Sequence, residues 1–111
     1  MATELVLLSD VPLTEEVHHR AYKRLGITGE MLEWLDGQVS TLHDETGQHI
    51  LTVHAPMVIH DAREAAIALM DPPEAFGLWS DIMVPFDNTE KGRTVAEAIA
   101  TEIGGLIRER I

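Results

Sequence analysis

Two closely spaced turn signals constrain the middle of this chain more than any other feature. Asp36-Gly37 stands between apolar flanks, and aspartate followed by glycine is a strong signal for a tight, two-residue hairpin turn. The run Asp44-Glu45-Thr46-Gly47 suits a type I turn with glycine in the left-handed position, another common hairpin closure. These turns predict a meander over residues 30–54, with strands at 31–35, 38–43 and 48–54. A short helix over 31–35, capped by Thr28, is the alternative for the first strand.

A strand and a helix are predicted ahead of the meander. Residues Glu4 to Ser9 form a short apolar run followed by turn residues, which indicates a buried strand. Thr14 is a good N-cap, and apolar residues recur at helical spacing after it, so a helix is predicted over Glu15–Leu25. Gly26 is expected to end that helix, because glycine adopts the left-handed conformation of a C-cap without strain.

Three or four further elements are predicted after the meander. A capping-box pattern precedes an apolar run and predicts a second helix over about Ala62–Met70. Residues Leu78–Val84 are rich in strand formers and alternate in part, which favours a strand. A last helix is expected to begin at Asn88 or Thr89 and to end at Gly104-Gly105. Residues 106–111 form either a terminal strand or a frayed end.

This order of elements predicts one α+β domain over residues 1–111. Strands that outnumber helices and follow one another through short turns favour a mostly antiparallel sheet of four to five strands, with the helices on one face. The core order βαββαβ, followed by a C-terminal helix, is that of ferredoxin-like folds. Such an architecture hosts many unrelated functions, so the function has to be argued from particular residues.

Charge is the outlying feature of the composition: 19 acids stand against 8 bases, and the net charge is −11. No base lies between Arg24 and Arg63, or between Arg63 and Lys91. A surface of this kind repels nucleic acid and anionic membranes and attracts a basic protein. Maintenance of solubility is the simpler explanation of the same excess. The acids in the two gaps are Glu30, Glu33, Asp36, Asp44, Glu45, Asp61, Glu64, Asp71, Glu74, Asp81, Asp87 and Glu90.

Further features bear on location and cofactors. The chain contains no cysteine, which excludes disulfides and thiolate metal sites. Its first residues lack the basic start and long apolar stretch of a secretory signal, and no run is long enough to span a membrane. A cytoplasmic location and the absence of a cofactor are therefore the expectations. No GxSxG, P-loop or HExxH motif is present, so no catalytic residue is predicted.

Histidine gives the one candidate for metal binding. If the turn at 44–47 closes as predicted, His43 and His49 lie opposite each other on one sheet face, where two imidazoles can share a divalent ion. Asp44 and Glu45 are the nearest carboxylates, but no third ligand is evident. Because catalytic zinc normally takes three protein ligands, two solvated histidines are the favoured interpretation.

The remaining candidates lie around the predicted strand at 78–84. Phe76 and Trp79, if exposed, would anchor an interface, and if buried they are core residues. Asp81 beside Trp79 is a candidate acid or base, although it also suits the less buried strand face, with Trp79 and Met83. The predicted interface residues are Phe76, Trp79, Asp81, Glu30, Glu33 and Asp36.

The sequence favours a non-catalytic protein-interaction domain that binds a basic protein, as an inhibitor, an immunity-type protein or a regulatory subunit would. The alternative is a small-ligand-binding protein or small enzyme of ferredoxin-like architecture that acts as a homodimer. Tyr22, Trp34, Asp81 and a histidine are the residues to test for that alternative. A deep apolar pocket with convergent polar groups would favour it.

Overall fold

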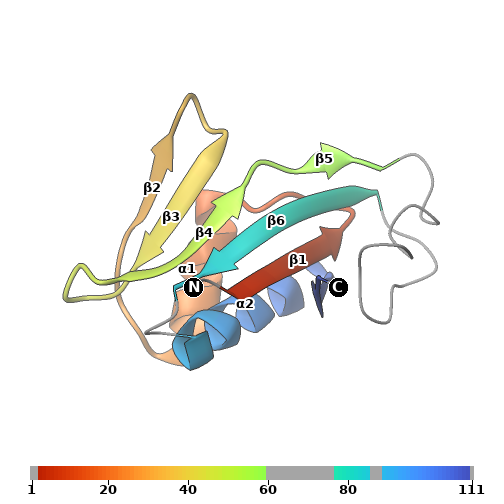
Figure 1. Cartoon of the computed structure of the whole chain (residues 1–111). Coiled ribbons are helices and arrows are strands. Elements are labelled where there is room, and N and C mark those ends of the chain that lie inside the picture. The colour runs from red at the N-terminus through yellow and green to blue at the C-terminus, as the bar shows by residue number, and fades with distance from the viewer. Residues whose placement is uncertain (1–2, 60–76, 86–88, 111) are drawn as a thin grey trace.

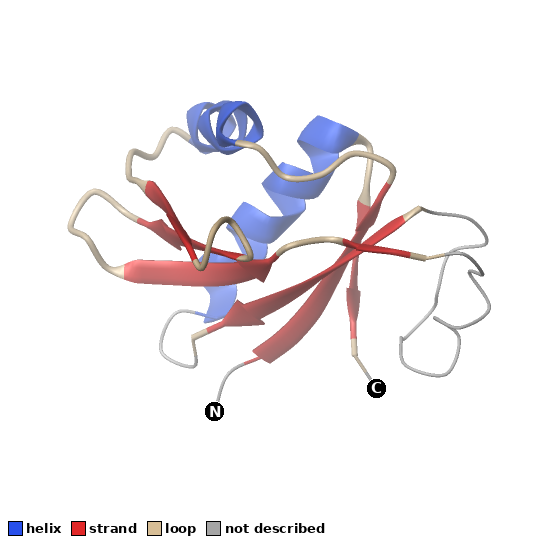
Figure 2. Ribbon diagram, turned by 90° about the horizontal axis from the view of Figure 1, so that it is seen from above, coloured by secondary structure: helices blue, strands red, loops and turns tan. Residues whose placement is uncertain are grey.

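A computed structural model describes residues 3–59, 77–85 and 89–110 of the protein. These residues form an antiparallel sheet with two helices on one of its faces (Figure 1). The edge-on view in Figure 2 places both helices on the same side of the sheet. The elements are β1 (Thr3–Ser9), α1 (Glu15–Leu25), β2 (Met31–Trp34), β3 (Val39–His43), β4 (His49–His54), β5 (Met57–Val58), β6 (Leu78–Val84), α2 (Thr89–Ile103) and β7 (Leu106–Glu109). The predicted helix at 62–70 and Phe76 lie outside the described residues.

The sheet has seven strands in the order β2-β3-β4-β6-β1-β7, and all pairs are antiparallel. The short strand β5 follows β4 and pairs with β6 as well, so Thr52 faces Met83 and Met57 faces Trp79. The prediction of a mostly antiparallel sheet with the helices on one face is confirmed. The predicted number of strands, four to five, was too small.

The predicted ferredoxin-like order is wrong. The hairpin turns keep β2, β3 and β4 together, and β4 is the strand that joins β6. The connection through α1 therefore carries the chain from β1, next to one edge of the sheet, to β2 at the opposite edge. Among the described elements, β6, α2 and β7 form a compact crossover unit, with β1 inserted between the two strands.

The meander forms as predicted, and the segment after Glu30 is a strand rather than a helix. The first hairpin closes through a longer loop, residues 35–38, because Trp34 already faces Val39. Gly29 comes just before β2 in the chain and lies very close to the end of β3. A Cβ atom at this position would overlap the carbonyl oxygen of His43. A glycine is thus required where the chain enters the edge strand.

Both ends of α1 and the C-terminal end of α2 are formed by the predicted capping residues. The Thr14 side chain accepts a hydrogen bond from the Val17 amide, and Gly26 ends α1 with a φ of 69°. Gly104 ends α2 in the same left-handed region, at a φ of 67°, and the next residues form β7 instead of a frayed end. α2 lies against the sheet at Gly92, where a Cβ atom would stand 2.9 Å from the Ile50 carbonyl oxygen.

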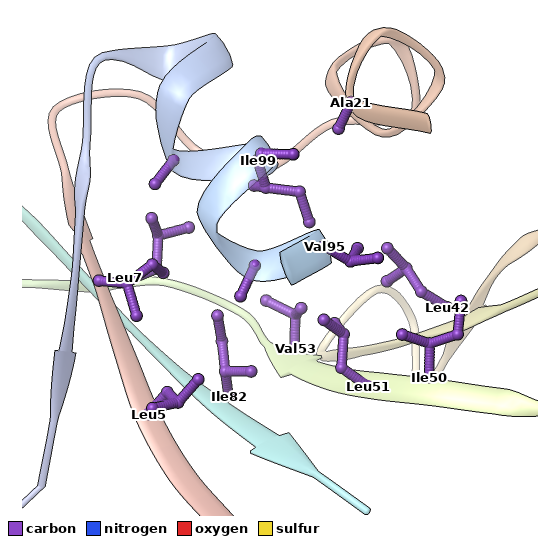
Figure 3. Close-up of a cluster of buried hydrophobic side chains, with 14 of the residues drawn as sticks. Leu5, Leu7, Ala21, Leu42, Ile50, Leu51, Val53, Ile82, Val95 and Ile99 are labelled. Carbon is purple, nitrogen blue, oxygen red and sulfur yellow. The ribbon is translucent and has the colours of Figure 1, made fainter. Parts of the chain in front are cut away.

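The core lies between the sheet and α2, with α1 packed against α2 on the same side (Figure 3). Strand alternation sends Ile82 and Val84 into this core and Asp81 and Met83 to the opposite face, as predicted. We call that opposite side the uncovered face. It holds a second, smaller cluster made by Val6, Leu8, Trp79 and Ile59. In the described ranges, neither helix is long and apolar enough to cross a membrane.

Candidate functional site

The most exposed apolar side chains of the meander gather on the β2–β3 hairpin. Leu32 is 39% exposed, Trp34 52% and Leu35 71%, although large apolar side chains are normally covered. Glu30, Glu33 and Asp36 are interleaved with them along the chain and are also exposed. We call these six residues the hairpin surface.

The position of β2 in the sheet explains this exposure. β2 is an edge strand, and its hairpin with β3 projects away from the helices (Figure 1). Leu32 and Trp34 point to the uncovered face, since Met31, the residue before Leu32, packs against the core on the other side and successive side chains of a strand alternate. Trp34 is nevertheless held in place, because its indole Nε1 donates a 2.8 Å hydrogen bond to Thr41 Oγ1. An exposed aromatic side chain with a fixed orientation is typical of an interface anchor.

The carboxylates of the hairpin surface have no neutralising partner in the part of the chain that the structure describes. Glu30, Glu33 and Asp36 form no ion pair with any residue that the structure describes. Several other acids are paired: Glu102 with Arg24 at 3.2 Å, Asp81 with Arg110 at 3.0 Å, and Glu109 with Arg93. The hairpin surface therefore combines exposed apolar area with a local excess of negative charge.

An open groove continues this surface toward the β3–β4 turn. It has a volume of about 600 Å³ and begins at Glu30 and Leu32. Glu45 adds another exposed carboxylate to it. The full lining is Thr28, Gly29, Glu30, Leu32, His43, Asp44, Glu45, Thr46 and Gly47.

Asp44, by contrast, is a structural carboxylate. It is buried, and its Oδ1 accepts hydrogen bonds from the Thr46 amide and hydroxyl and from the Gln48 amide, at 2.9, 2.6 and 3.0 Å. Its Oδ2 accepts a hydrogen bond from Lys91 Nζ at 3.1 Å. The hydrogen bond from the Thr46 side chain is the largest cause that holds the pKa of Asp44 well below its usual range. The hydrogen bonds from Lys91 and from the backbone amides lower this pKa further.

His43 and His49 face each other across the predicted turn, with ring centroids 5.7 Å apart. His49 Nε2 lies 2.8 Å from Thr52 Oγ1, so this ring also has a partner within the sheet. Nowhere in the described ranges do three histidines or carboxylates gather closely enough to hold a metal ion. The carboxylate nearest in sequence, Asp44, is engaged by its own turn.

Tyr22 joins α1 to the same turn from the core side. Its hydroxyl donates a 2.8 Å hydrogen bond to the His43 carbonyl oxygen. Burial raises the pKa of Tyr22, and the negative charges of Asp44 and Glu45 raise it further. The phenol is therefore a protonated donor that fixes the turn on the helix.

Trp79 and Asp81 form a separate cluster on the uncovered face. Trp79 is only 8% exposed, which favours the core interpretation over the interface one. Its Nε1 donates to Asp81 Oδ1 at 2.9 Å, and Arg110 Nη1 donates to the same oxygen at 3.0 Å. A small cavity of about 120 Å³ and an open groove of about 470 Å³ both adjoin Asp81 and His54.

The structure thus brings three predicted interface residues together on the hairpin and separates them from Trp79 and Asp81. Sequence reasoning missed the apolar members of the hairpin surface, which are Leu32, Trp34 and Leu35. The signal was the run Met31 to Leu35, in which Trp34 and Leu35 are adjacent and cannot both point into the core from a regular strand.

No protein-family model matches this chain, and neither a curated protein nor a solved structure matches it. The function is therefore argued from the hairpin surface.

Proposed function

We propose that this protein is a non-catalytic interaction domain that binds a basic protein partner through the hairpin surface. The observation that carries the proposal is the exposed, hydrogen-bonded Trp34, flanked by two exposed leucines and by three exposed carboxylates that form no ion pair with a described residue. An anchor of this type supplies apolar contact area, and the carboxylates favour lysine and arginine on the partner.

The excess of acids is consistent with a role in steering the encounter. Opposite charge on two proteins raises the rate of association and makes it sensitive to salt. A partner with a basic surface is favoured over a neutral one for that reason. An inhibitor, an immunity-type protein or a regulatory subunit acts in this way.

The ligand-binding alternative has less support. It called for a deep apolar pocket, whereas the grooves named above are open and lined by many polar residues. Its candidate residues also lie apart: Tyr22 packs in the core on the helix side, Trp34 lies on the hairpin, and Asp81 lies beside Trp79. Homodimer formation stays a prediction for the solution state.

Affinity capture at low ionic strength tests the proposal, with the full chain as bait and three variants beside it. Trp34→Ala removes the anchor, and a Glu30→Gln, Glu33→Gln, Asp36→Asn variant removes the hairpin charges. A Glu4→Gln, Glu90→Gln, Glu97→Gln variant removes equal charge from elsewhere on the surface. We expect a stoichiometric basic partner that is lost with the first two variants and retained with the third.

Two results would contradict the proposal. One is a partner that all three variants retain equally, which would place binding elsewhere on the protein. The other is a partner whose capture is independent of salt between about 20 mM and about 300 mM, since screening weakens attraction between exposed charges.

A further inference from the structure

The outer side of β2 is free to bind a further strand. In the described part of the chain, β2 pairs with β3 alone. The His43 amide donates to the Glu30 carbonyl oxygen, which makes Glu30 and His43 a hydrogen-bonded pair of the ladder. Such pairs recur at every second residue, so Leu32–Thr41 and Trp34–Val39 are hydrogen-bonded too. The N–H and C=O groups of Met31 and Glu33 consequently point outward from the sheet edge.

The side chains along this edge form two columns with different chemistry. On the uncovered face the column is Glu30, Leu32 and Trp34, and on the helix side it is Met31 and Glu33. A strand placed beside β2 would set its own side chains next to both columns in turn. Opposite charges and apolar pairs are the favourable neighbours across two strands.

We propose that the partner binds by adding an extended segment to β2, antiparallel, with side chains in the order apolar, basic, apolar, apolar, basic. These positions lie beside Trp34, Glu33, Leu32, Met31 and Glu30 respectively. The antiparallel direction continues the pattern of the whole sheet. Binding through main-chain hydrogen bonds, with specificity from alternate side chains, is a known mode of peptide recognition. This inference rests on the proposed function and names the segment that the hairpin surface recognises.

A second copy of this chain fits the edge poorly. The strand at the other edge of the described sheet, β7, would place Leu106 beside Trp34 and Arg110 beside Glu30 in the antiparallel register. It would also place Ile107 beside Glu33, Arg108 beside Leu32 and Glu109 beside Met31, none of which suits the pattern. Pairing of β2 with the β2 of another copy would line up four glutamates along one junction, at a cost from like charges. Neither β7 nor β2 of a second copy matches the pattern along β2, so a different protein is the favoured partner.

A capped heptapeptide, Thr-Val-Lys-Val-Val-Lys-Thr, is the probe for this inference. We expect it to bind the isotopically labelled full chain and to shift the amide resonances of β2 first, with a dissociation constant on the order of millimolar. Glu33→Lys weakens binding about fivefold or more, because it turns one favourable pair into a repulsive one. The matched control, Glu97→Lys on the exposed side of α2, leaves the dissociation constant within about twofold.

Backbone methylation of the peptide separates strand addition from other contacts at the same surface. The amides of the first lysine and the third valine face β2 in the proposed register, and methylation of both is expected to weaken binding about tenfold. Methylation of the middle valine and the second lysine, whose amides face away, is expected to change it little. Equal effects from the two methylated peptides would overturn strand addition.

The remaining outcomes are equally decisive. No binding by the heptapeptide, shifts centred away from β2, or a dimer of the free chain that competes with the peptide would each overturn the inference. If captured partners depend on Trp34 but binding ignores peptide methylation, the proposed function stands and the strand-addition inference fails.

Discussion

The two tryptophans show how neighbouring strands decide the role of a residue type. Trp79 lies in the interior of the sheet, beside Leu8 on β1, and is buried. Trp34 lies on the edge strand, which has no described strand on one side, and more than half of it stays exposed. Both indoles donate a hydrogen bond to a nearby side-chain oxygen. Edge position, rather than local sequence, therefore makes Trp34 the candidate anchor.

His18 gives a prediction about acid stability. It is 1% exposed, and neither ring nitrogen has a hydrogen-bond partner among the residues that the structure describes. Burial lowers its pKa from 6.5, and the neighbouring His19 lowers it further, while Glu15 acts in the opposite direction. The unfolded chain therefore binds a proton more readily than the folded one below about pH 6.5, so stability falls as the pH drops through that value.

We expect His18→Leu to lose less stability than the wild type between about pH 7.5 and about pH 5.5, where carboxylates stay largely ionised. Urea denaturation at both pH values measures this difference. His19→Leu is the companion variant: because His19 contributes to the lowered pKa of His18, its loss of stability over this range is expected to lie between those of the wild type and His18→Leu. A His18→Leu variant with the full wild-type loss would contradict the assignment.

At the scale of elements, the β3–β4 turn is the point where the meander is fastened to both helices. Tyr22 binds it from α1 through the His43 carbonyl oxygen, and Lys91 binds it from α2 through Asp44. The turn therefore sets the position of β3 and, through β3, of the edge strand β2. The proposed partner would bind a hairpin held by this attachment.

The attachment predicts a ranking of substitutions in the turn. Asp44→Ala removes the acceptor for the Thr46 and Gln48 amides, whereas Lys91→Met removes only the ion pair. We expect Asp44→Ala to lower the urea midpoint at pH 7 more than Lys91→Met, because it removes three hydrogen bonds to a charged carboxylate in addition to the ion pair.

Glu45→Ala serves as the control within the same turn. Glu45 is exposed, and a surface substitution of this kind changes the free energy of unfolding by about 0.5 kcal/mol or less. If Asp44→Ala were no more destabilising than Glu45→Ala, the structural role of Asp44 would be wrong. The lowered pKa of Asp44 also determines how stability depends on pH. The contribution of Asp44 to stability is present above about pH 4 and is lost as the pH falls toward its folded-state pKa.

At the scale of the whole molecule, the net charge of −11 opposes compaction. Salt shortens the range of that repulsion, from about 30 Å at 0.01 M to about 8 Å at 0.15 M. We therefore expect the thermal midpoint to rise between these ionic strengths at constant pH. Differential scanning calorimetry measures it.

The hairpin variant Glu30→Gln, Glu33→Gln, Asp36→Asn provides the comparison. Its net charge is −11 + 3 = −8, so its midpoint is expected to rise less with salt. A midpoint that falls with salt in the wild type would mean that attractive ion pairs outweigh the repulsion. In that case the acidic excess would not be the main electrostatic contribution to stability.

The sequence by itself determined the local structure of this protein. Thr14 begins α1 and Gly26 ends it, while Gly104 ends α2. The turn at 44–47 places His43 opposite His49. Caps and turns are set by neighbours in the chain, which is why residue type and spacing predict them. The alternation in β6 likewise predicted that Ile82 and Val84 lie in the core and that Asp81 and Met83 lie on the other face, although Trp79 on that face is covered as well.

Only the tertiary structure decided the strand order, and with it the candidate site. The pairing of β4 rather than β2 with β6, and the insertion of β1 between β6 and β7, depend on contacts between residues far apart in the chain. No local pattern encodes them. Because that order leaves β2 at the edge, it also determines that Leu32, Trp34 and Leu35 are exposed beside Glu30, Glu33 and Asp36, while Trp79 is covered.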